Sequence, residues 1–235
     1  MKKGNLYLIP SDIGNDKLTD VLPQKVFDVI LKTEVFIVEN LRTARRFLRK
    51  AGFRQDFEKI SFHLLDKHTK PEEYQSFLAS CLQGKNTGLL SEAGTPCIAD
   101  PGSAIVNLAH RQNIRVIPLV GPSSILLALM ASGFNGQHFC FHGYLPIKKH
   151  ERESKLRDLE KAAFSLNQTQ IFIETPYRNM QMFASIIKTC NNKTQLCIAT
   201  NISAEHEVIK KMPVSEWKKA KVDLHKKPTV YLIFV

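Results

Sequence analysis

The stretch Ser91–Gly102, with the sequence SEAGTPCIADPG, concentrates residue types that bind small ligands through backbone groups. Its two glycines carry no side chain, which lets the backbone approach a ligand closely. Its two prolines stiffen the chain, so that the backbone donors are oriented before anything binds. The stretch follows the apolar run 87–90, and loops at the carboxyl ends of strands are where open α/β sheets bind their ligands. We therefore interpret it as part of a binding site.

The turn Gly121-Pro122-Ser123-Ser124 lies between an apolar strand-like run and an apolar helix-like run. Ser123 or Ser124 could cap the helix, because serine side chains accept hydrogen bonds from first-turn N–H groups. The amides of the same turn could instead hold a carboxylate, because helix N-termini carry partial positive charge. The residues alone leave both interpretations open.

Two polar residues, Glu39 and Arg42, follow the apolar run EVFIV, again at the carboxyl end of an expected strand. They are candidates for chemistry in the same region as Ser91–Gly102. Arg42 also begins a run of cations at helical spacing, which continues with Arg45, Arg46, Arg49 and Lys50. Such a stripe suits either RNA phosphates or a solvated helix face.

His138, Cys140 and His142 alternate, which would place all three on one face of a strand. They could bind a metal, but no fourth ligand is evident, so we expect a structural role and no metal. The charged stretch Lys148–Lys161 is typical of a solvated helix face. The sequence lacks G-x-G-x-x-G after its first strand, a Walker loop and a G-x-S-x-G elbow, which argues against ordinary dinucleotide, nucleoside triphosphate and α/β-hydrolase sites.

The elements that must position these residues alternate along the chain. We expect strands at 5–10, 34–38, 60–64, 87–90, 115–120, 139–144, 170–174, 195–201 and 229–235. We expect helices at 22–32, 43–52, 71–81, 102–112, 124–132, 148–165 and 178–189. In the first half this alternation favours crossover units and a largely parallel sheet. The pattern changes after Gly121, which predicts two α/β domains, 1–120 and 121–235.

Composition limits the class of protein. The 235 residues are 43% hydrophobic, which suffices for a packed core, and no apolar run is long enough to cross a bilayer. Five scattered cysteines without a C-x-x-C pair suit free thiols in a reducing cytoplasm. The formal net charge of +11 favours a polyanionic partner, with nucleic acid ahead of a membrane surface.

Several segments together resemble the tetrapyrrole methylase superfamily, and within it the bacterial branch that methylates a cytidine 2′-hydroxyl of small-subunit ribosomal RNA. The pattern S-D-A-G-T-P-x-I-S-D-P-G is matched by Ser91, Ala93, Gly94, Thr95, Pro96, Ile98, Asp100, Pro101 and Gly102. The patterns T-P-I-G-N, E-D-T-R, P-G-P-S-A and E-S-P-H-R are matched in part by Ile13-Gly14-Asn15, by Glu39 and Arg42, by Gly121-Pro122-Ser123, and by Glu174, Pro176 and Arg178. The matches run to about residue 187.

The resemblance implies two α/β domains with S-adenosylmethionine in the cleft between them, a homodimer and no metal. It implies that the cofactor is held by Ser91, Ala93, Gly94, Thr95, Asp100, Pro101, Gly121, Pro122, Ser123 and Ser124. Methyl transfer to a ribose hydroxyl needs close approach, alignment and loss of the hydroxyl proton. Glu39, Arg42 and His63 are the catalytic candidates, with Glu39 and His63 orienting or deprotonating the hydroxyl.

The chain also departs from the family's pattern. Glu92 and Asn40 stand in place of aspartates and Leu41 in place of a threonine, and Ser11-Asp12 alters the opening motif. Where the family shows R-E-L-T-K, this chain has residues 200–204, TNISA, although Glu207 remains. The cofactor half of the resemblance is thus stronger than the substrate half.

Three hypotheses follow. The first is a cytoplasmic S-adenosylmethionine-dependent methyltransferase acting on small-subunit ribosomal RNA or the 30S subunit. The second is a small-molecule methylase of the tetrapyrrole type, which the net charge does not exclude because tetrapyrroles carry many carboxylates. The third is a cofactor-binding protein without turnover. The basic charge favours RNA.

Overall fold

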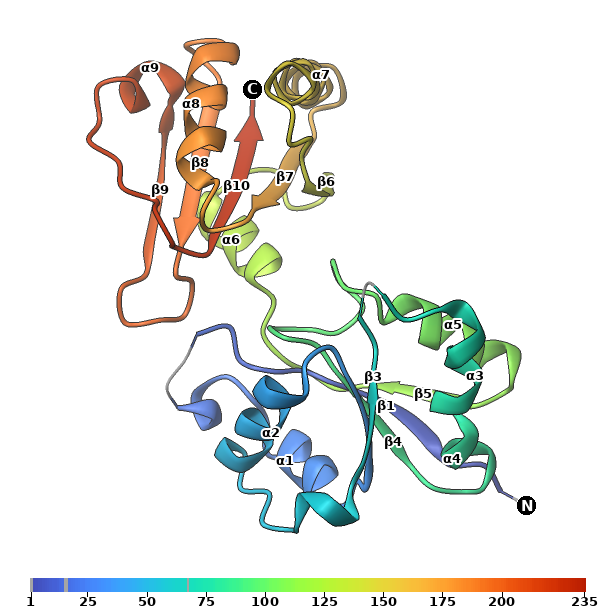
Figure 1. Cartoon of the computed structure of the whole chain (residues 1–235). Coiled ribbons are helices and arrows are strands. Elements are labelled where there is room, and N and C mark those ends of the chain that lie inside the picture. Colours follow the sequence, from blue (N-terminus) through green and yellow to red (C-terminus); the bar gives the residue numbers. More distant parts are fainter. Residues whose placement is uncertain (1, 15–16, 67) are drawn as a thin grey trace. The chain divides into compact units, whose positions relative to one another are not determined.

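The computed structural model describes residues 2–14, 17–66 and 68–235 (Figure 1). The chain divides into two compact units, Met1–Ser123 and Ser124–Val235. Each has its own five-stranded sheet and its own hydrophobic core. The α/β class expected from the sequence is confirmed.

The sheet of the first unit is entirely parallel, as the alternation of strands and helices predicts. Its strand order is β3-β2-β4-β1-β5. The strands are β1 (Asn5–Ile9), β2 (Val35–Val38), β3 (Ser61–Leu64), β4 (Thr87–Leu90) and β5 (Arg115–Pro118). Two of the three inner strands, β2 and β4, are buried throughout, which explains why neither contains a charged residue.

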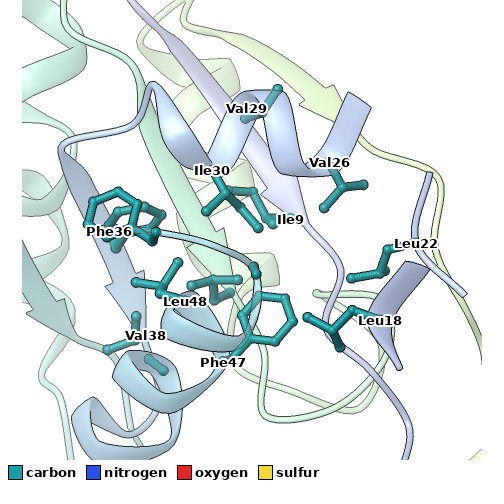
Figure 2. Packing of buried hydrophobic residues seen from close by; sticks show 14 of the residues in the cluster. Ile9, Leu18, Leu22, Val26, Val29, Ile30, Phe36, Val38, Phe47 and Leu48 are labelled. Atoms are coloured by element: carbon teal, nitrogen blue, oxygen red, sulfur yellow. The ribbon is translucent and has the colours of Figure 1, made fainter. Parts of the chain in front are cut away.

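Helices pack against this sheet, and their apolar side chains form two separate clusters with those of the strands. The longer helices are α1 (Gln24–Leu31), α2 (Leu41–Lys50) and α5 (Ser103–Arg111), and the short ones are α3 (Tyr74–Phe77), α4 (Ala79–Leu82) and the 3₁₀ turns Leu18–Asp20, Phe57–Lys59 and Pro71–Glu73. Figure 2 shows one cluster, in which Ile30 of α1 and Leu48 of α2 pack with Ile9 and Phe36 of the sheet. The other cluster joins Ile37 and Leu89 to residues of α3, α4 and α5.

The single helix predicted for Pro71–Cys81 is wrong. The segment forms a 3₁₀ turn followed by α3 and α4, which are separated at Leu78. The Leu78 backbone leaves the helical range (φ −102°, ψ 3°) while its side chain is fully buried. Packing into the core therefore overrides the local helical preference here.

The second unit has a mixed sheet with the order β6-β7-β10-β8-β9. The strands are β6 (Phe139–Tyr144), β7 (Thr169–Glu174), β8 (Gln195–Thr200), β9 (Val208–Pro213) and β10 (Thr229–Phe234). Only β6 and β7 are parallel, and the other neighbours are antiparallel. The helices are α6 (Ser124–Ser132), α7 (Lys149–Leu166), α8 (Asn179–Thr189) and α9 (Val214–Trp217). Side chains of α7 and α8 pack with Phe172 and Tyr231 in the core, and α6 contacts β9 and β10.

Two global features bear on the class of protein. All five cysteines are free thiols. In the part of the chain that the structure describes, no helix is both long and apolar enough to span a bilayer.

Candidate functional site

The loop 91–102 connects β4 to α5, and its first half is anchored to the segment that follows β1. The Ser11 N–H donates to the Gly94 carbonyl oxygen (2.9 Å), and the Gly94 N–H donates back to the Asp12 carbonyl oxygen (3.2 Å). The Ser11 hydroxyl also donates to the Ser91 carbonyl oxygen (3.1 Å). The predicted binding loop therefore has a fixed position beside the carboxyl end of β1.

The second half of this loop is folded around Asp100. Its carboxylate accepts hydrogen bonds from the Cys97 N–H and the Gly102 N–H, both at 2.8 Å. Between these donors the backbone is left-handed at Cys97 (φ 71°) and Ala99 (φ 64°), which is uncommon for residues with a side chain. Asp100 thus maintains a strained loop, a role that its place in the motif alone does not reveal.

Gly94 joins the loop to the turn at 121–123. It has φ +69°, and a Cβ added there would lie 3.1 Å from the Pro122 carbonyl oxygen. Within the described residues, the Ala93 and Thr95 N–H groups beside it donate no hydrogen bond. These amides flank a position without a side chain, a donor set that suits the polar edge of a small ligand.

The turn itself lies close to β1. A Cβ added at Gly121 would lie 2.2 Å from Pro10 Cβ, so only glycine fits. Ser123 is the last residue of the first unit, and Ser124 is the first residue of α6 in the second. The glycine of the predicted turn is therefore explained by packing inside the first unit.

Glu39 follows β2 and lies against the same loop. Its carboxylate accepts a hydrogen bond from the Glu92 N–H (3.2 Å). With Asp100, Gly102 and the apolar side chains of Ile37, Val38, Leu65, Leu89 and Leu90, it lines a small pocket. Burial raises the pKa of Glu39, and the carboxylates of Asp100 and Glu92 raise it further, against the opposing Glu92 N–H. This carboxyl group has a stronger affinity for a proton than an ordinary glutamate.

Glu92, which the sequence marked only as a departure, links this loop to α2. Its carboxylate accepts a hydrogen bond from the Thr43 hydroxyl (2.6 Å). Asn40, another departure, caps α2 by accepting from the Arg42 and Thr43 N–H groups (2.9 and 3.2 Å). Both substitutions therefore have local partners.

The cations of α2 do not form one uniform stripe. Arg49 donates to the Phe53 and Gln55 carbonyl oxygens (2.7 and 2.9 Å), and its guanidinium lies 4.0 Å from the Phe57 ring centroid. Lys50 lies 3.8 Å from the Asp12 carboxylate. Arg42, Arg45 and Arg46 remain exposed, although Arg45 also lies over the rings of Phe57 and Phe62. Arg49 thus stabilises the fold, and the exposed cationic surface of α2 is smaller than the helical spacing of its cations predicts.

His63 lies on the edge strand β3, stacked on Phe77 with ring centroids 5.0 Å apart. Burial lowers its pKa, which keeps the ring neutral at neutral pH. Its register partner is Ile37, which lines the pocket of Glu39. His63 thus lies on the same side of the sheet as the pocket, where its ring packs on Phe77.

The motif ETPYR in the second unit forms a closed corner at the end of β7. Glu174 is 1% exposed, and its Oε1 accepts from Arg178 Nη2 (2.6 Å) and from the Thr175 N–H (2.7 Å). The next residue, Asn179, is fully buried and hydrogen-bonds to the Lys227 carbonyl oxygen and the Tyr231 hydroxyl (2.6 and 3.1 Å). No sequence signal pointed to Asn179, because its partners lie about fifty residues away.

The segment that replaces R-E-L-T-K connects β8 to β9 and is closed by its own groups. Asn201 (φ 50°) and Ser203 (φ 65°) are left-handed. The Ser203 N–H donates to the Glu207 carboxylate (2.7 Å), and the Asn201 amide donates to the His206 carbonyl oxygen (3.3 Å). Asn15, part of the opening motif, lies outside the described residues.

His142 lies in β6 and His138 directly precedes it, and the rings of both hydrogen-bond to amide groups. His138 Nδ1 lies 3.0 Å from the Leu166 carbonyl oxygen and Nε2 lies 2.8 Å from the Gln168 amide, and His142 Nε2 lies 2.7 Å from Gln170 Oε1. Across residues 2–14, 17–66 and 68–235, no cluster of three or more His, Cys, Asp or Glu is arranged to hold a metal ion.

Comparison with known proteins gives consistent matches. The family model for tetrapyrrole (corrin/porphyrin) methylases matches residues 6–218. A protein of Vibrio cholerae named ribosomal RNA small subunit methyltransferase I is 31% identical over 211 residues, which are 90% of this chain and 69% of the relative. A protein of the same name from Buchnera aphidicola is 32% identical, over 99% of this chain and 78% of the relative.

Solved structures share the fold at low identity. Uroporphyrin-III C-methyltransferase from Thermus thermophilus, complexed with S-adenosyl homocysteine, matches with a TM-score of 0.58 and 15% identity, over 98% of this chain and 97% of that chain. Diphthine synthase matches with a TM-score of 0.67 and 16% identity, over 98% of this chain and 89% of that chain.

Proposed function

This chain belongs to the tetrapyrrole (corrin/porphyrin) methylase family, and from that premise we propose that it is an S-adenosylmethionine-dependent methyltransferase that 2′-O-methylates a cytidine of small-subunit ribosomal RNA. The observation that carries the proposal is the match over 90% of the chain to a relative named as a methyltransferase of small-subunit ribosomal RNA. The solved tetrapyrrole methyltransferases are only about half as similar in sequence and indicate the fold alone. Their likeness therefore gives the small-molecule alternative no support of its own.

The loop 91–102 and the turn at 121–124 suit the cofactor. Ala93 and Thr95 offer amides without internal partners, and Gly94 leaves room between them. Asp100 and Pro101 hold the loop in shape, and Ser91 closes its base through the Gly94 carbonyl oxygen (3.3 Å). We assign cofactor binding to these residues and to Gly121, Pro122, Ser123 and Ser124. The bound cofactor supplies a methyl group on a sulfonium sulfur.

The chain's own task is to position the ribose hydroxyl and to receive its proton. Glu39 suits the second role, because its carboxylate lines a pocket beside the loop and its pKa is raised. Arg42, exposed at the first turn of α2, suits a phosphate next to the acceptor ribose. We assign His63 as a positioning residue that shapes the pocket side of the sheet through Phe77.

The electrostatic character supports RNA as the partner. The net charge is +11, and Arg42, Arg45 and Arg46 are exposed on one helix. RNA binding by such surfaces is driven by the release of counterions from phosphates.

We also propose a homodimer in the cytoplasm. Helix α6 carries almost only apolar residues, yet Leu126 and Met130 are 50% and 76% exposed. Exposed apolar side chains on a helix that is apolar all round are typical of an interface. Sedimentation of the intact chain and of Met130→Glu tests this: the variant should shift toward the monomer.

Methyl transfer to RNA is the direct experiment. Small subunits from a strain lacking this gene should accept labelled methyl groups, and subunits from the parent strain should not. The labelled linkage should resist alkaline hydrolysis, because a 2′-O-methyl group removes the nucleophile of that cleavage. No transfer to either the 30S particles or free small-subunit RNA would overturn the proposal. Label released by alkali as a single nucleotide would show that the methyl group is on a base and not on the 2′-hydroxyl.

A further inference from the structure

An exposed aromatic side chain stands at the corner where β7 ends and β10 begins. These strands are antiparallel, and Glu174 pairs with Thr229, so residues 175–178 and 224–228 lie together. Tyr177 is 71% exposed at this corner. With most of its surface exposed, this side chain is accessible to a planar ligand that stacks on the ring.

The corner is held from beneath by buried polar groups. Asn179, which directly follows residues 175–178, donates to the Lys227 carbonyl oxygen (2.6 Å) and to the Thr229 hydroxyl (3.2 Å). Its side chain therefore connects the two segments of the corner. The Lys226 N–H donates to the Pro176 carbonyl oxygen (3.1 Å), directly beside Tyr177. The ring is therefore presented by a rigid support, which lowers the entropy that binding would cost.

A lysine and a histidine lie next to the ring. Lys226 Nζ lies 5.9 Å from the Tyr177 ring centroid, and the His225 ring meets it edge to face at 6.4 Å. The segment 218–227, KKAKVDLHKK, contains five lysines and one aspartate. That aspartate, Asp223, is paired with Lys227 (3.0 Å). The charge of Lys226 is therefore not neutralised by an acidic residue of its own segment.

We propose that Tyr177 stacks on an unpaired nucleobase of the RNA substrate while Lys226 and His225 contact the adjoining backbone. An exposed ring beside cations is the combination that binds single-stranded nucleic acid, because stacking accepts any base and the cations follow the phosphates. This inference rests on the proposed function, since it names a contact for the same substrate. It assigns that contact to residues of the second unit that have no role in the proposed cofactor binding or proton transfer.

The test uses the intact protein and a short fluorescent single-stranded RNA. Tyr177→Ala should weaken binding about tenfold, whereas Tyr177→Phe, which keeps the ring, should bind like the wild type. Lys226→Ala should weaken binding and lower the salt slope by about one phosphate contact. Phe164→Ala and Lys161→Ala are matched controls, because both residues are exposed on α7 of the same unit, and they should change neither quantity.

Methyl transfer to small subunits provides the second readout. Tyr177→Ala should raise KM with kcat and cofactor affinity unchanged. RNA affinity and KM equal to those of the wild type in Tyr177→Ala would overturn the stacking proposal and leave the methyltransferase assignment intact. A wild type that methylates no RNA would overturn the proposed function instead, and the loss of oligonucleotide binding in Tyr177→Ala alone would still support the stacking site. Equal losses of RNA affinity in Tyr177→Ala and Phe164→Ala would indicate a general surface effect and would also overturn the stacking proposal.

Discussion

Two glutamates at the carboxyl ends of strands, one in each unit, have opposite surroundings. Glu39, after β2, accepts one backbone hydrogen bond and has the carboxylates of Asp100 and Glu92 nearby, and within the described residues no cation lies within 4 Å of it. Glu174, at the end of β7, is buried against Arg178. The surroundings of the first carboxyl group raise its pKa, and the second carboxyl group is held in an ion pair within the fold.

The loops beside these glutamates differ in the same way. The loop 91–102 uses Asp100 to hold left-handed backbone and leaves the amides around Gly94 without partners. The corner 174–178 instead closes on its ion pair and on Asn179. Two strand-to-helix connections with family motifs can therefore differ: in the first, unpaired backbone amides suit the proposed cofactor, and in the second, a closed backbone supports the exposed ring of Tyr177.

Replacing Glu39 should have the largest effect. Glu39→Gln should lower kcat about 10²- to 10⁴-fold, the usual contribution of a general base. In the wild type, kcat/KM should rise with pH through an inflection above the ordinary glutamate pKa of 4.5, and the variant should lose that inflection. His63→Gln should lower kcat while the inflection stays, because His63 acts through position.

The same substitution should not weaken the fold. A raised pKa means that the neutral carboxyl group is favoured in the folded state, so its stabilising contribution is present below pH 4.5 and is lost as pH rises through the raised pKa. Glu39→Gln should therefore melt at the same temperature as the wild type or higher at neutral pH. A clear fall in melting temperature would show that Glu39 stabilises the folded state, as Glu174 is expected to do.

Replacing Glu174 should have the reverse outcome. Glu174→Gln leaves the Arg178 guanidinium without its counter-charge beside a buried site, which costs about 3 kcal/mol of stability. Cofactor affinity of the remaining folded protein should be unchanged. Chemical denaturation measures the loss, and Asp20→Asn is the control, because the Lys17–Asp20 pair is exposed and contributes less than about 1 kcal/mol. Equal effects of the two substitutions would contradict the structural role of Glu174.

Gly94 distinguishes crowding at the binding loop from backbone strain. Gly94→Ala adds a Cβ 3.1 Å from the Pro122 carbonyl oxygen at φ +69°, so cofactor affinity should fall about tenfold or more while stability falls by about 1 kcal/mol. Gly52→Ala is the matched control, since Gly52 also has positive φ but open space around it. The control should lose stability alone. Unchanged cofactor affinity in Gly94→Ala would remove Gly94 from the binding site.

The sequence predicted those parts of the fold that depend on local pattern. Strands such as β2 and β4 are short apolar runs, and their alternation with amphipathic helices predicts the parallel sheet. β9 was missed because Lys210 and Lys211 break its apolar pattern, and only pairing with β8 defines it as a strand. The break at Leu78 was missed for a related reason, since burial in the core decides it.

The candidate site was predictable to a similar extent. The glycines and prolines of the loop 91–102 predict a binding loop, because these residue types act on their own backbone and no distant contact has to be known. The roles of Glu92 and Asn179 depend on contacts with Thr43 and with residues near Lys227, which are distant in sequence. The use of Arg49 within the fold depends likewise on Phe57 and on two carbonyl groups. Spacing alone predicts a face of a helix but not which of its side chains are already engaged.

The smallest effect is expected at Asn40, where the family has aspartate. Asn40→Asp keeps the cap of α2, because the two residues accept equally well from the Arg42 and Thr43 N–H groups. The added charge gains from the helix dipole but lies next to Glu39, so stability should change by less than about 0.5 kcal/mol. It should also raise the pKa of Glu39 further, moving the inflection in kcat/KM to higher pH. Asn40→Ala, which removes the cap, should lose about 1 kcal/mol by denaturation and leave that inflection in place. An inflection that moves with Asn40→Asp but not with Asn40→Ala would identify Glu39 as the titrating group.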